Sequence, residues 1–111
     1  MAVKHIVALR FKPSVHSATI AEATIQAFQR LLALKDGCIL PTTNRPYIQS
    51  ISGGQDMSIE GRQNLFTHAF VAEFDSVEDR DYYVREDPYH AEFARSLQPL
   101  IEDVQVLDFI V

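Results

Sequence analysis

Hydrophobic and polar residues alternate along the first part of the chain. Residues 3–12 place one set of side chains on each face of an extended segment, and this period of two predicts a β-strand. Pro13 ends the pattern. The side chains that share the predicted inward face are Val3, His5, Val7, Leu9 and Phe11.

A helical pattern follows this strand. Apolar residues recur at three- and four-residue spacing from about residue 17 to residue 34, which predicts an amphipathic helix that Gly37 closes as a left-handed cap. A loop leads to a short strand over residues 47–52, which the glycine pair at 53–54 ends. Residues 55–65 are polar and contain glycine, and they form either a solvated hairpin loop or a lid.

A second alternating stretch covers residues 66–74 and predicts another strand. Ser76 is the expected N-cap of the next helix, with carboxylates in its first turn where they suit the helix dipole. Asp87 and Pro88 begin a further helix as N-cap and first helical residue, and residues 104–111 form the last strand. The inward face of the strand at 66–74 carries Phe66, His68, Phe70, Ala72 and Phe74.

The predicted order of elements is β-α-β-β-α-α-β within a single domain, residues 1–111. This is the split βαβ arrangement of a ferredoxin-like α+β fold, in which a four-stranded antiparallel sheet carries helices on one face. With the strands numbered along the chain, we expect the sheet order 4-1-3-2. That order puts the strands of His5 and His68 side by side.

Helices can cover only one face of such a sheet. The other face carries apolar side chains that are unfavourable in contact with water. Two sheets that face each other across a two-fold axis bury these side chains, so we predict a homodimer that forms an α+β barrel. The residues expected on the uncovered face include Ile6, Ala8, Ala69 and Val71.

Composition and charge narrow the classes of function. The formal net charge is −5 and the ten lysines and arginines are scattered, so no nucleic-acid partner is expected. No segment approaches the roughly 20 apolar residues of a membrane helix, and the first residues show no signal-peptide pattern. With Cys38 as the single cysteine, these features predict a cytoplasmic protein.

Three of the four histidines are candidates for chemistry. His5 and His68 interrupt apolar strand faces, so each either packs in the core with a hydrogen-bond partner or faces a ligand. His90 lies early in its helix on the inward face, where the helix dipole disfavours the imidazolium form. A neutral imidazole suits a general base, and the alternative is a packing or capping histidine. His16 is expected in solvent.

No spacing in the sequence indicates a metal or a nucleotide cofactor. The histidines do not lie three or four residues apart, so a zinc site would have to be assembled from separate elements. The glycine pair at 53–54 lacks the lysine of a phosphate-binding loop and does not precede a helix. We therefore predict that the protein works without a metal or cofactor.

Three segments resemble signature stretches of the stress-responsive dimeric A/B barrel family: Val-Lys-His-Ile-Val at 3–7, Phe-Thr-His-Ala-Phe at 66–70 and Asp-Pro-Tyr-His-Ala-Glu-Phe at 87–93. The likeness spans nearly the whole chain and implies a dimer of ferredoxin-like domains. Residues 51–54, 60–61 and 78–83 resemble the fungal branch of the family. Members of that branch are mostly without assigned activity.

The family includes plant olivetolic acid cyclase, which closes a linear tetraketide by an aldol condensation and needs no cofactor. The resemblance implies that His90 is the base and Tyr83 its helper, while His5 and His68 match two further pocket histidines. Tyr83 lies one residue farther from His90 than in the cyclase, and Asp87 replaces the first histidine of the cyclase's His-Pro-x-His stretch. The family also contains a hydroxynitrile lyase and boiling-stable stress proteins, so the fold alone does not select a function.

Three functions follow from these observations. The first is a cofactor-independent cyclase-like or lyase-like enzyme for a polyketide-like or other carbonyl substrate, with His90 as base and Tyr83, His5 or His68 as donor to the oxyanion. It requires a cavity of roughly a few hundred Å³ beside His90. The second is a non-catalytic stress or small-molecule-binding dimer, and the third is a structural assembly module. The apolar residues expected to contact a ligand are Val7, Phe28, Phe66, Phe70 and Phe93.

Overall fold

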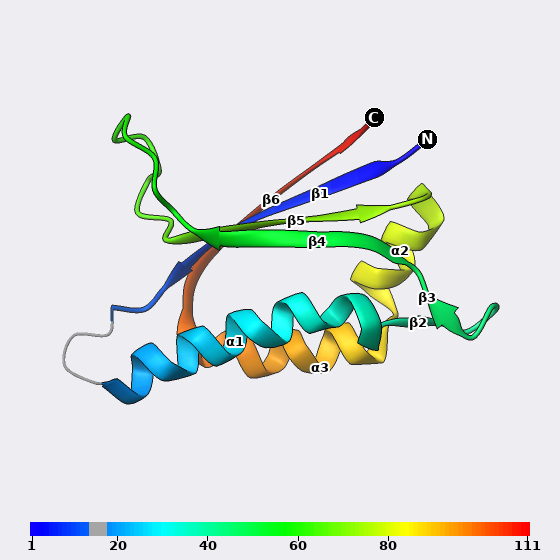
Figure 1. The fold of residues 1–111 in the computed structure, drawn as a ribbon, viewed down its shortest axis with the longest axis horizontal. Helices are drawn as coiled ribbons and strands as arrows, with labels where there is room; N and C mark the ends of the chain where they lie inside the picture. Colours follow the sequence, from blue (N-terminus) through cyan, green and yellow to red (C-terminus); the bar gives the residue numbers. More distant parts are fainter. Residues whose placement is uncertain (14–17) are drawn as a thin grey trace.

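The computed structural model describes residues 1–13 and 18–111. An antiparallel sheet forms one layer, and the helices form a second layer on one of its faces (Figure 1). A small two-stranded ribbon and a 3-10 turn, η1, are added to the predicted elements. The bounds are β1 Val3–Phe11, α1 Ala18–Gly37, β2 Ile39–Leu40, β3 Arg45–Pro46, β4 Ile48–Gln55, β5 His68–Phe74, α2 Val77–Arg85, α3 Pro88–Leu97, η1 Gln98–Leu100 and β6 Ile101–Ile110.

The main sheet has four strands in the order β4-β5-β1-β6, with every neighbouring pair antiparallel. This confirms the predicted strand order and the ferredoxin-like α+β fold. In the central strand β1, His5 lies opposite Ala72 of β5 and opposite Asp108 of β6. The two chain ends lie near each other in Figure 1, because Val3 of β1 pairs with Ile110 of β6.

The burial of β1 confirms the predicted period of two. Every second residue from Val3 to Phe11 is buried, and the residues between them are partly exposed. Helix α1 packs on β4, and α2 packs on β1 and β5. The edge strand β6 is exposed along almost its whole length. Space therefore remains on the helix side of the sheet near β6.

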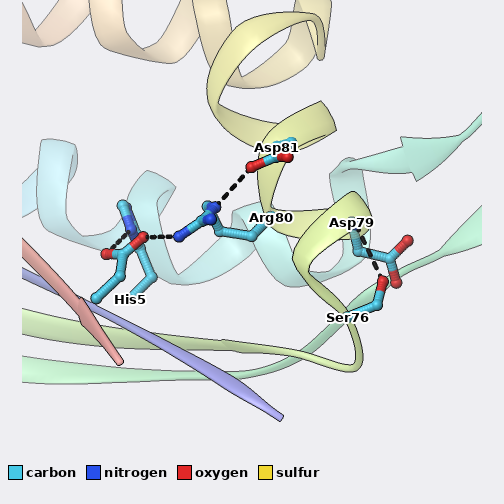
Figure 2. A network of polar contacts seen from close by, with 6 residues as sticks. His5, Ser76, Asp79, Arg80 and Asp81 are labelled. Carbon is cyan, nitrogen blue, oxygen red and sulfur yellow. Dashed lines mark hydrogen bonds and ion pairs between the residues drawn. The ribbon is translucent and has the colours of Figure 1, made fainter. Parts of the chain in front are cut away.

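The predicted helix starts are both present. The Ser76 hydroxyl accepts a hydrogen bond from the Asp79 amide at 3.1 Å and caps α2; both residues are drawn in Figure 2. Asp87 caps α3, and Pro88 is its first residue. These caps fix the residues at which α2 and α3 begin, and the start of α3 determines the position of His90.

Both predictions about glycine positions were wrong. The pair at 53–54 does not end the strand, because β4 continues to Gln55. A Cβ on Gly53 would lie 2.5 Å from the Ala69 carbonyl oxygen, so glycine there permits the close approach of β4 to β5. Gly37 is the last residue of α1 and has no positive φ. A Cβ there would meet the ring of Tyr89, so close packing rather than a left-handed turn explains this glycine.

Two strand boundaries also differ from the predicted ones. The strand predicted from residue 66 begins at His68, because Asn64 and Leu65 have φ values of 51° and 68° that turn the chain just before Phe66. The last strand begins earlier than predicted, at Ile101. In the segment predicted as a plain loop, β2 and β3 pair as a short ribbon.

No helix in the described part of the chain covers the second face of the sheet (Figure 1). On it, Ile6 pairs with Val71 of β5 on one side and with Leu107 of β6 on the other. Leu107 is 61% exposed and Phe109 is 51% exposed. An apolar surface of this kind is what the sequence predicted for the uncovered face. Among the described residues, no helix is long and apolar enough to cross a membrane.

Candidate functional site

A cavity of about 560 Å³ lies between the sheet and the helices α2 and α3. It occupies the space beside β6 that α1 does not reach, and it meets the size predicted for a ligand site. One end is polar, with His5, Tyr83, His90, Arg80 and Asp108. The rest is mainly apolar, and its wall includes Val7, Leu9, Phe70, Phe93, Leu97 and Val106.

His5 is held by a carboxylate from the neighbouring strand. Its Nδ1 lies 2.8 Å from Oδ1 of Asp108, and the imidazole is only 6% exposed. The other carboxylate oxygen of Asp108 accepts a hydrogen bond from Nη1 of Arg80 at 2.5 Å. Arg80 also donates from Nε to Asp81 at 2.9 Å, so the four side chains form a continuous polar chain (Figure 2).

The hydrogen bond between Asp108 and His5 determines which nitrogen of His5 can contact a ligand. A carboxylate accepts but does not donate, so the contact with Asp108 assigns the hydrogen to Nδ1 in the neutral imidazole. Nε2 is then left with a free lone pair. Asp108 and Asp81 together raise the pKa of Arg80 above its usual value, which keeps its positive charge opposite the carboxylate of Asp108.

His90 lies on the third residue of α3 and stacks on Tyr83 of α2. The two ring centroids are 3.9 Å apart, with 25° between the ring planes. Burial is the main cause that lowers the pKa of His90, and His5 adds to the effect, while the backbone of Tyr83 and the charge of Asp87 oppose it. A lowered pKa keeps the imidazole neutral at neutral pH, which is the form that accepts a proton.

Tyr83 connects the two histidines. Its side chain is 1% exposed, and its ring meets the ring of His5 edge-on with centroids 5.8 Å apart. Burial, with smaller contributions from Cys38 and Asp87, raises the pKa of Tyr83, so the phenol keeps its hydrogen. The adjacent Tyr82 instead packs against Tyr47, on the side away from the cavity. Tyr83 is therefore the tyrosine that faces the candidate site.

His68 does not join the other two imidazoles. It pairs with Leu9, four residues along β1 from His5, which separates the two by about 13 Å along the strand. Its ring packs against Phe11 and Phe28, and its Nδ1 lies 2.9 Å from the Thr67 hydroxyl. Burial lowers its pKa. His68 is thus a half-buried histidine with a polar partner, apart from the cavity that His5 and His90 share.

The predicted ligand-contacting residues divide in the same way. Val7, Phe70 and Phe93 line the cavity with His5 and His90. Phe28 is next to His68, and Phe66 lies in the loop before β5. The loop between β4 and β5 contributes no side chain to this cavity, so it does not cover the site in the structure. The prediction for His16 lies outside the described residues.

Sequence reasoning missed Asp108 and Arg80. Asp108 follows Val104 and Val106 at a spacing of two, so it shares their inward face. A carboxylate on an apolar inward face was a signal that a partner was needed. In residues 1–13 and 18–111, no group of three or more histidine, cysteine or acidic side chains is arranged to hold a metal ion.

The strand order and the helix layer define a ferredoxin-like α+β protein. Its cavity is mainly apolar and carries two histidines, His5 and His90, on its wall. A family model described as the stress responsive A/B barrel domain matches residues 3–111, and the chain belongs to that family. Stress-response A/B barrel domain-containing protein HS1 from Arabidopsis thaliana is 31% identical over 107 residues, which cover 96% of this chain and 87% of HS1.

Two solved structures show the same fold. Hydroxynitrile lyase from Passiflora edulis is 28% identical, with a TM-score of 0.72, over 99% of this chain and 93% of the lyase. A dimeric ferredoxin-like protein of unknown function from Jannaschia is 17% identical, with a TM-score of 0.74, over 100% of both chains. At 17% identity the second likeness concerns the fold alone.

Proposed function

We propose that this protein is a cofactor-independent enzyme that moves protons on a small carbonyl compound bound between its sheet and α2 and α3. The observation that carries the proposal is that His5 and His90 lie on the wall of one cavity with Tyr83 in contact with both rings. Two proton-transfer groups and a phenol beside an apolar pocket are the parts that such chemistry requires.

His90 is the proposed general base. Its free ring nitrogen removes a proton from the carbon next to the carbonyl, and the electron pair of the broken C–H bond forms an enolate. The phenol of Tyr83 donates a hydrogen bond to the enolate oxygen, an effect that at well-built sites is worth about 2.7–4 kcal/mol. The enolate carbon then attacks a second carbonyl of the same chain and forms a C–C bond, as in an aldol cyclisation.

His5 is the proposed second proton-transfer group. Asp108 holds Nδ1–H, which leaves Nε2 to take over the proton that His90 removed from carbon and pass it to the new alkoxide, so that both imidazoles end neutral. Such exchange between a carbon acid and an oxygen base serves either the making or the breaking of a C–C bond. Positioned acid–base groups of this type contribute about 10²–10⁴ in rate.

Two lines of similarity support this class of reaction. The relative from Passiflora edulis is named a hydroxynitrile lyase, and the signature stretches around His5 and His90 resemble those of a polyketide cyclase. The apolar length of the cavity beyond the polar end suits the hydrocarbon part of a polyketide-like substrate. A non-catalytic binder would use the same apolar wall and would leave the histidines without a chemical role.

The same proposal includes a homodimer. Ile6, Val71 and Leu107 form an apolar row on the sheet face that no helix covers. A second copy of this chain, placed face to face across a two-fold axis, buries the row in a closed interface. Several proteins with this fold are described as dimeric, the Jannaschia protein among them.

Exchange of α-protons tests the proposed function without knowledge of the natural substrate. The wild-type protein is incubated in D₂O with a panel of aliphatic and aryl methyl ketones, and loss of the α-proton signal is followed by NMR. Exchange faster than in buffer supports the proposal if Ala94→Trp, which fills the cavity from α3, abolishes it. Ala91→Trp is the matched control, because Ala91 is exposed on α3 outside the cavity wall. Binding of the ketones without exchange would favour the non-catalytic function.

A further inference from the structure

Asp87 is one of the most buried charged residues in the part of the chain that the structure describes. It is 2% exposed. Its Oδ1 accepts hydrogen bonds from the amides of Tyr89 at 2.9 Å and His90 at 3.3 Å. Its Oδ2 accepts a hydrogen bond from the hydroxyl of Tyr47 at 2.5 Å. Both carboxylate oxygens therefore accept hydrogen bonds from the protein.

The Tyr47 contact goes beyond what a helix cap needs. A helix cap needs one side-chain oxygen, which accepts a hydrogen bond from the first amides of the helix. Here a buried tyrosine from the segment just before β4 binds the second oxygen, 40 residues away in sequence. The ring of Tyr47 is itself held between Phe74 and Tyr82, with centroid distances of 6.1 and 5.6 Å.

This arrangement ties the start of α3 to two other parts of the fold. The amide of Asp87 donates to the Tyr82 carbonyl at 2.9 Å, which fixes it to the end of α2, and Tyr47 fixes its carboxylate to the sheet. His90 is the third residue of α3, and its amide is bound by the same carboxylate. A rotation of Asp87 would therefore move His90 relative to the ring of Tyr83.

We propose that Asp87, held in place by the Tyr47 hydroxyl, is a positioning residue that sets the place and the proton affinity of His90. The catalytic meaning of this arrangement rests on the proposed function, whereas the positioning does not. The groups that change the pKa of His90 are Asp87 at its helix start, Tyr83 on α2 and His5 on β1, and the same cavity is also lined by Arg80, Asp81, Arg85 and Asp108. The nearby thiol of Cys38 stays neutral, because burial and Asp87 raise its pKa.

NMR titration of the His90 imidazole tests the proposal in the wild-type protein and three variants. Asp87→Asn keeps the cap and removes the charge, so we expect the pKa of His90 to fall further. Tyr47→Phe removes one hydroxyl, and we expect shifted or broadened His90 ring signals and weaker NOEs to Tyr83. Tyr82→Phe is the control, because its hydroxyl makes no hydrogen bond to Asp87; it should leave His90 unchanged.

A His90 pKa and ring signals that stay at wild-type values in both Asp87→Asn and Tyr47→Phe would overturn the proposal. Asp87→Ser, which also supplies a capping oxygen, replaces Asp87→Asn if that variant does not fold. The NMR readout needs no turnover, so it stays informative if the proposed reaction fails. If the reaction is present, Tyr47→Phe should lower kcat by about tenfold or more with little change in KM, and the acid limb of the pH profile should follow the His90 pKa.

Discussion

The imidazole of His90 stacks on the phenol ring of Tyr83, with a centroid distance of 3.9 Å and 25° between the ring planes. The two residues belong to different helices, so the contact depends on the turn between α2 and α3. Asp87 and Pro88 form that turn as cap and first residue of α3. One face of the imidazole is thereby desolvated, and the ring still reaches the cavity wall. The helix start that Asp87 and Pro88 mark in the sequence therefore also places His90, the candidate base, against Tyr83.

Stability should depend on pH through two partly buried histidines, His90 and His68. Burial lowers the pKa of His90 and of His68, while both titrate near pH ~6.5 in the unfolded chain. Between that pH and the lower folded pKa values, the unfolded chain binds more protons, so the free energy of unfolding falls as pH falls. We expect urea unfolding to show lower stability toward pH ~5 and His90→Gln to reduce this decrease. An identical pH dependence in wild type and His90→Gln would contradict the burial of a neutral His90.

Asp108→Asn should separate the role of the polar chain from general stability. The change removes the negative charge between His5 and Arg80, and hydrogen bonds to charged groups contribute about 1.5–3 kcal/mol. We expect a loss in this range or below, because Asp108 is partly exposed, and a fall in α-proton exchange of about tenfold or more. Activity is measured by NMR exchange and stability by urea unfolding.

Glu102→Gln is the matched control for Asp108→Asn. Glu102 lies on β6 like Asp108, and the change removes its charge from the ion pair with Arg10 of β1, at the surface and away from the cavity. Exposed pairs of this kind contribute about 0–1 kcal/mol, and we expect no effect on exchange. Equal activity in the two variants would show that the contact between Asp108 and His5 has no role in the reaction.

Two adjacent glycines should respond differently to the same substitution. A Cβ on Gly53 would lie 2.5 Å from the Ala69 carbonyl oxygen and 2.6 Å from Cβ of Phe70, whereas Gly54 has open space at this position. Gly53→Ala should therefore destabilise the protein by about 1–3 kcal/mol through overpacking. Gly54→Ala should be nearly neutral in the same thermal or urea unfolding experiment. Similar losses for both would mean that β4 does not approach β5 as closely as described.

Leu107→Arg tests the proposed homodimer. Leu107 is 61% exposed on the uncovered face of the sheet, where a charge would be buried without a partner in the proposed interface. We expect light scattering to show a shift from dimer to monomer. Ile25→Arg is the control, since Ile25 is 58% exposed on α1 in the helix layer and should leave the dimer intact. A wild-type protein that is monomeric at micromolar concentration would contradict the proposal directly.

The sequence predicted the features that depend on local patterns. Alternation over residues 3–12 identified β1 and its inward face, and the caps Ser76 and Asp87 identified the starts of α2 and α3. These signals work because strand faces and helix ends are set by near neighbours in the chain. The inward direction of His5 and His90 was therefore predictable.

What the sequence did not predict depends on pairing between distant segments. The distance of His68 from His5 follows from its pairing with Leu9, and the contact of Asp108 with His5 follows from the register of β6. A strand pattern specifies which face a side chain occupies but not how far along the neighbouring strand it lies. The close approach at Gly53 is of the same kind, because it depends on β5.

The central claim is that His90 acts as a base inside the cavity that it shares with His5. The most direct measurement is NMR-detected exchange of ketone α-protons in D₂O with wild type, His90→Gln and His68→Gln. We predict exchange well above the buffer rate for wild type, a loss of about 100-fold for His90→Gln, and little change for His68→Gln, whose half-buried imidazole packs against Phe28 outside the cavity. Exchange that persists in His90→Gln, or that fails equally in His68→Gln, would contradict the claim.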